Sequence, residues 1–107
     1  MKSAAIRELN DAFRKTFSGG RVVMTASVDA LPEIVRANAL LKVTRFAAFS
    51  PDNDPHGEHD SGTFELVGQQ FFWKIDYFDP NMEFGSKDPT EPTKTKRVLT
   101  LMLAEDY

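Results

Sequence analysis

The residues that could do chemistry gather in one polar segment, residues 50–62, with the sequence SPDNDPHGEHDSG. This segment holds the only two histidines of the chain, His56 and His59. Four carboxylates accompany them: Asp52, Asp54, Glu58 and Asp60. Imidazole and carboxylate groups together bind divalent metals such as zinc, manganese or iron, and a bound metal can activate water for hydrolysis. His56, His59 and Asp60 are therefore candidate ligands of a divalent metal, the one cofactor that the sequence leaves open.

Asp76 extends this candidate set, because it lies in a predicted strand and could add a ligand if the edge of the sheet lies beneath the loop. The segment HGEHD differs from the helical H-E-x-x-H motif, since its histidines are three residues apart and two prolines nearby oppose a helix. A structural role is the alternative. Asp and Asn beside Pro and Gly bond to their own backbone in turns, and a histidine can lock a loop through a carboxylate. Composition favours this alternative over metal binding, and no catalytic residue is assigned.

The first half of the chain predicts two helices and a strand. Residues 3–17 form an amphipathic helix, because Ile6, Leu9, Phe13 and Phe17 recur at spacings of three and four, and two glycines follow. A strand is expected over residues 21–28, covered on both faces because Val23 interrupts its alternation. A second helix is expected to begin at residues 31–33, where a proline suits the first turn, and to reach about residue 48.

The second half predicts three strands. Residues 63–67 and 70–78 flank Gly68-Gln69, a hairpin signal, and the second arm alternates apolar with mixed residues. Residues 97–103 are interpreted as a strand from their period of two, although a helix stays the rival. The order α-β-α-β-β-β predicts an α+β fold, with two helices packed on one face of a four-stranded antiparallel or mixed sheet.

Length and composition predict a single domain over residues 1–107. The chain has no cysteine, no apolar leader and no run of apolar residues that could span a membrane, so we expect a cytoplasmic protein. Its net charge of −3 is uneven. Residues 1–49 carry eight basic and four acidic residues, net +4, whereas residues 50–93 carry two and ten, net −8. Such an imbalance can mark a partner surface, although the carboxylates could simply solvate loops.

Several stretches also bear a resemblance to a known family: IRELNDAFRKTF, GGRVVMTASV, PDNDPHGEHDSG, FFWKIDYFD and TKRVLTLMLAEDY. Over residues 6–107 the chain resembles a family of small bacterial proteins catalogued as domain of unknown function 3768. The resemblance implies a free-standing cytoplasmic protein, of a kind often encoded on plasmids and other mobile elements. It carries over no catalytic residue.

Three functions follow as hypotheses. The first is a non-enzymatic protein-binding or regulatory accessory module of a mobile element, because no nucleophile or cofactor motif is present. The second is a metal-dependent hydrolase that uses the HGEHD loop. The third is an acidic mimic of nucleic acid that blocks a host defence protein, against which the small net charge counts. We expect a protein partner and do not expect direct binding of nucleic acid. The sequence leaves open whether the chain forms a homo-oligomer.

Overall fold

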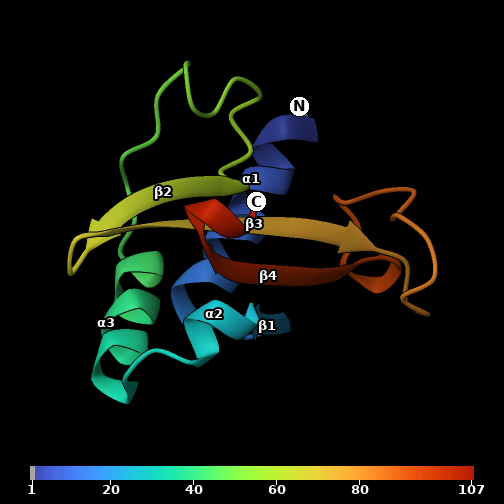
Figure 1. The fold of residues 1–107 in the computed structure, drawn as a ribbon. Helices are drawn as coiled ribbons and strands as arrows, with labels where there is room; N and C mark the ends of the chain where they lie inside the picture. Colours follow the sequence, from blue (N-terminus) through green and yellow to red (C-terminus); the bar gives the residue numbers. More distant parts are fainter. Residues whose placement is uncertain (1) are drawn as a thin grey trace.

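The computed structural model describes residues 2–107 as an α+β fold with three helices and a four-stranded mixed sheet (Figure 1). The strands lie in the order β1-β4-β3-β2, with β1 parallel to β4 and the other pairs antiparallel. The helices are α1 (Lys2–Thr16), α2 (Ala26–Asp29) and α3 (Glu33–Thr44). The strands are β1 (Gly20–Met24), β2 (Ser61–Leu66), β3 (Gln69–Phe78) and β4 (Lys96–Leu103). Short 3₁₀ turns cover Pro92–Lys94 and Ala104–Asp106.

The core forms between the two longer helices and one face of the sheet. Phe13 of α1 and Val43 of α3 join one buried cluster with Phe71, Trp73 and Ile75, which alternate along β3. The predicted alternation of β3 is therefore confirmed, and so is the apolar stripe of the first helix at Ile6 and Phe13. Burial of such large side chains away from water is the main favourable contribution to folding.

The predicted strand over residues 21–28 is wrong in its second half. β1 ends at Met24, and Val28 reaches the core from the short helix α2, so the element order contains one more helix than expected. The carboxylate of Asp106 explains this end, because it accepts hydrogen bonds from the Thr25 hydroxyl and the Leu103 backbone N–H, both at 2.9 Å. The expected cover on both faces is also wrong, since Val23 is 37% exposed.

The helix expected to reach residue 48 stops four residues earlier, at Thr44. The guanidinium of Arg14, on α1, explains the end of α3. Its Nη1 donates to the carbonyl oxygens of Val43 and Phe46, at 2.8 and 2.9 Å. Carbonyls at the end of a helix lack partners within the helix, and a cation there satisfies them.

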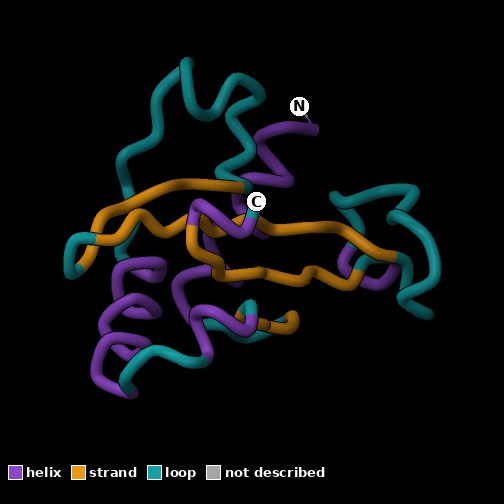
Figure 2. Tube along the Cα trace, viewed as in Figure 1, coloured by secondary structure: helices purple, strands orange, loops and turns teal. Residues whose placement is uncertain are grey.

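The hairpin and the last strand follow the predictions closely. β2 and β3 pair in register Ser61↔Lys74 to Leu66↔Gln69. Their turn is Val67-Gly68, one residue earlier than expected, and both residues have positive φ angles of 48° and 75°, as a tight hairpin turn requires. β4 is a strand and not a helix. Two long connections remain, residues 45–60 and the segment between β3 and β4; Figure 2 shows both as loops, apart from the short 3₁₀ turn Pro92–Lys94 in the second.

Candidate functional site

The first helix holds the polar loop in place. Arg7 Nη1 donates to the carbonyl oxygen of Gly57 at 3.1 Å, and Asn10 Nδ2 donates to that of Glu58 at 3.0 Å. Within the loop, Asn53 Nδ2 donates to the carbonyl oxygen of Ala48 at 2.9 Å. Each bond fixes backbone that a long connection would otherwise leave free. The loop is therefore attached to α1 along its second half.

His59 lies between two carboxylates. Its Nδ1 is 3.0 and 3.1 Å from the two carboxylate oxygens of Asp11, and its Nε2 is 3.7 Å from Asp54 Oδ2. The backbone N–H of His59 donates to Asp54 Oδ1 at 3.2 Å. The imidazole also stacks on Phe49, with ring centroids 3.7 Å apart. These contacts hold His59 at a φ of 54°, in the left-handed region that residues other than glycine rarely adopt.

Asp11 joins this histidine to a buried arginine. Arg14, 1% exposed, places its Nη2 3.0 Å from Asp11 Oδ1, and its guanidinium lies 5.4 Å from the centre of the Phe49 ring. Burial raises the pKa of Asp11, but hydrogen bonds from His59 and Arg14 outweigh it and hold that pKa below its usual value. Asp11, Arg14, Phe49, Asp54 and His59 form what we call the His59 cluster.

The remaining residues of the predicted site are not members of the His59 cluster, although His56 and Asp60 lie near it. His56 is exposed and lines a surface pocket of about 410 Å³ together with Asp54 and His59. Asp76 forms an ion pair with Lys74 at 2.8 Å, on the other face of the sheet from the core residues of β3. Asp60 is half-buried, and burial raises its pKa, with smaller contributions from the nearby charges of Asp54 and Asp76.

The predicted ligands do not form a metal centre in this conformation. Within residues 2–107, no three His, Asp or Glu side chains are grouped so that they could hold a metal ion. The site at His56, His59 and Asp60 therefore stays a prediction.

A second polar network lies beneath the loop. Asn10, fully buried, donates from Nδ2 to the Tyr77 hydroxyl at 2.8 Å and accepts at Oδ1 from Arg97 Nε at 2.8 Å. The Tyr77 hydroxyl donates to Glu58 Oε1 at 3.4 Å. Burial raises the pKa of Tyr77 above its usual value. The side chain of Glu58, a predicted site residue, thus contacts β3 through Tyr77.

The sequence reasoning missed the residues of α1. Asn10, Asp11 and Arg14 bind the loop through polar contacts, and none of them was among the predicted site residues. One signal was present in the sequence. Ile6, Asn10 and Arg14 follow one another at intervals of four residues, so Asn10 and Arg14 lie on the same side of the helix as the apolar stripe. A polar residue on a buried stripe needs a buried partner.

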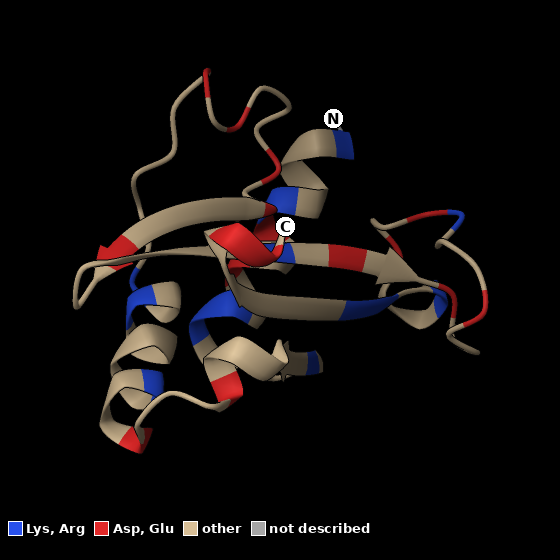
Figure 3. Ribbon diagram, in the orientation of Figure 1, with Lys and Arg blue, Asp and Glu red and all other residues tan. Residues whose placement is uncertain are grey.

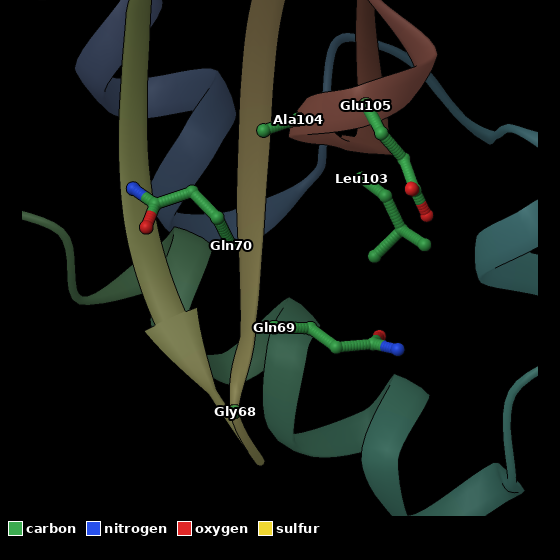
Figure 4. A pocket seen from close by; sticks show the side chains of 6 residues that line it. All are labelled: Gly68, Gln69, Gln70, Leu103, Ala104 and Glu105. Carbon is green, nitrogen blue, oxygen red and sulfur yellow. The ribbon is translucent and has the colours of Figure 1, made fainter.

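Another pocket lies at the β2–β3 turn (Figure 4). It measures about 390 Å³, and Glu105 is the only charged residue among the six that line it. The others are Gly68, Gln69, Gln70, Leu103 and Ala104. This pocket contains none of the predicted site residues.

Comparison with known proteins gives one result. A family model described as "Protein of unknown function (DUF3768)" matches residues 24–106, most of the chain but without α1. No curated protein and no solved structure matches. Among the helices of residues 2–107, none has the length and apolar character needed to cross a membrane.

Proposed function

Because the chain belongs to this family, whose description assigns no function, we propose from its own geometry that it is a non-enzymatic, regulatory protein-binding module. We place it in the cytoplasm, as an accessory product of a mobile element, which is what the family resemblance suggests. The loop of residues 45–60 is the surface that would contact the partner protein.

The fixation of this loop carries the proposal. Both ring nitrogens of His59 face carboxylates of the chain itself: Nδ1 lies 3.0 Å from Asp11 Oδ1, and Nε2 lies 3.7 Å from Asp54 Oδ2. The guanidinium of Arg14, the cation beside them, forms an ion pair with Asp11 and donates to the carbonyl oxygen of Val43 at the end of α3. The groups that a catalyst would use instead join α1 to the loop.

The tip of the loop has what a binding surface needs. Pro51, Asp52, Pro55 and His56 are exposed, while the backbone on either side is held by Asn53 and Asp54. A loop that is ordered before it binds loses little entropy on binding. Acidic residues lie along it (Figure 3), and residues 50–93 carry net −8. The favoured partner is therefore a protein with a basic surface.

A tagged chain expressed in its native host tests this proposal. We expect a stoichiometric protein partner that is retained at low salt and released as salt rises, because the attraction is electrostatic. Asp52→Lys combined with His56→Ala, at the exposed tip, should abolish the interaction. Glu33→Lys, an equal change of charge at the exposed start of α3, is the matched control and should retain it. A chain that retains no protein and turns over a small substrate would overturn the proposal.

A metal-dependent hydrolase is the second candidate, and one observation favours it. Both histidines and Asp54 line the same pocket of about 410 Å³, which is open to a small substrate. A divalent metal there would need a change in the loop that brings His56 and Asp60 to the same point as His59.

A further inference from the structure

The second face of the sheet carries a self-complementary pattern. Four residues alternate along β3 on the face opposite the core: Phe72, Lys74, Asp76 and Phe78. None of the four belongs to the core cluster formed by the described residues. All are partly exposed, and Lys74 and Asp76 show 36% and 40% of their side chains to solvent. Figure 3 shows the basic and the acidic band on this strand.

The order of these side chains is symmetric about Ile75. A two-fold axis that lies between two copies of this face and crosses β3 at Ile75 brings Phe72 opposite Phe78 of the other copy. The same axis brings Lys74 opposite Asp76. Every contact along the strand is then between two apolar rings or between opposite charges, which is what an isologous interface requires. We propose that two copies of the chain associate through this face, with their β3 strands antiparallel.

The neighbouring strand is compatible with such packing. Thr100 of β4 pairs with Lys74 and is partly exposed, whereas Val98, which pairs with Asp76, is only 8% exposed. Thr100 is therefore the uncharged side chain that β4 places beside the charged pair. Val23 of β1 lies beside Thr100 and is 37% exposed. When two sheets pack face to face, they lie about 10 Å apart and their strands cross at about 30°. Small and medium-sized side chains such as these fit between two sheets at that distance.

Large apolar side chains extend the surface at both ends of the strand. Tyr107 packs edge-on against Phe72, with centroids 5.0 Å apart, and is 82% exposed. At the other end Gly85 bridges to Phe78, and the adjoining Phe84 is 70% exposed. The two-fold axis brings the Tyr107 end of one copy near the Phe84 end of the other. Exposed apolar side chains on either side of a charged pair are of the kind that protein interfaces bury.

Charge decides the orientation. Within one copy the Lys74–Asp76 pair is solvent-exposed, and such pairs contribute little to stability. Between two copies the antiparallel arrangement creates two further pairs in a less polar setting. A parallel arrangement would place Lys74 on Lys74 and Asp76 on Asp76, and like charges at an interface are strongly unfavourable. The face therefore selects a second copy in one orientation.

Sedimentation equilibrium of the full chain, at concentrations up to about 200 µM, tests the proposal. We expect a monomer–dimer equilibrium. Lys74→Asp alone, or Asp76→Lys alone, sets like charges opposite each other and should raise the dimer Kd by about tenfold or more. The double variant Lys74→Asp with Asp76→Lys restores opposite charges and should restore dimerisation. Lys42→Asp, on the exposed side of α3, is the control and should dimerise as the unmodified chain does.

A mixing experiment separates this interface from any other. The two single variants carry only acidic or only basic charges at positions 74 and 76, so equimolar mixing should yield a heterodimer with near-normal Kd. A monomeric unmodified chain would overturn the proposal. A dimer whose Kd is unchanged by the substitutions at positions 74 and 76 would also overturn it, because such a dimer must form through another surface. The test uses no residue of the loop, and its failure leaves the proposed partner interaction standing.

Discussion

At the scale of single residues, Asp11 is the point where the loop, the first helix and the second long helix meet. Its carboxylate contacts His59 of the loop and Arg14, which in turn bonds to the last carbonyls of α3. The ionised form of Asp11 is the one that these contacts favour, which is why its pKa lies below the usual value.

This pKa predicts how stability depends on pH. A carboxylate whose pKa is depressed in the folded state contributes its full stability above the unfolded pKa of about 3.8, and loses it as pH falls through the folded pKa. Asp11→Asn should therefore cost about 1 kcal/mol at pH 7, a modest value because the side chain is 25% exposed. The difference from the unmodified chain should shrink near pH 3.

Urea denaturation at the two pH values measures this effect. Asp52→Asn is the matched control, since Asp52 is an exposed residue of the same loop, and it should change stability little at either pH. An Asp11→Asn cost that is equal at pH 3 and pH 7 would show that the ionised pair is not its origin.

At the scale of elements, close contact between β2 and the segment after α3 depends on a glycine. A Cβ on Gly62 would lie 2.6 Å from Phe46 Cζ and 2.8 Å from Trp73 Nε1. Gly62→Ala must therefore push Phe46 away from the sheet, and we expect a loss of about 1–3 kcal/mol in the free energy of unfolding.

Gly85→Ala is the control for this substitution. Its Cβ would meet no atom closer than 3.8 Å, so its stability should stay near that of the unmodified chain. Thermal or urea denaturation of the two variants decides the point. Equal stability of both would show that Phe46 moves aside at no cost.

Most elements could be predicted because they depend on local patterns. The 3.6-residue period of α1 and the two-residue period of β3 and β4 each arise within one segment. The predicted ends of β1 and α3 were wrong because a residue distant in the sequence binds the chain at each of these points. Arg14 ends α3 at Thr44, and Asp106 binds Thr25 where β1 stops. No local pattern around residues 25 or 44 contains either partner.

At the scale of the whole molecule, the metal hypothesis depends on convergence between the loop and the sheet. His56, His59 and Asp60 come from the loop and Asp76 from β3, and the fold places Asp76 beside Lys74. If the second candidate function holds, untagged protein should contain about one divalent metal per chain by elemental analysis, and His56→Ala should lower that content. Metal well below one per chain, unchanged by His56→Ala, would remove the hydrolase hypothesis. His56 suits this test because, unlike His59, it is exposed.

By itself the sequence determined the class of the fold, the hairpin and the position of both histidines in one polar loop, and it favoured a strand over a helix for residues 97–103. These depend on residue type and short-range spacing. Only the tertiary structure decided what the histidines contact, because Asp11 is 48 residues from His59 and such pairing leaves no periodic trace. It also decided which face of the sheet the two longer helices cover. The alternation of β3 separates two faces, but the packing of α1 and α3 chooses the one they cover.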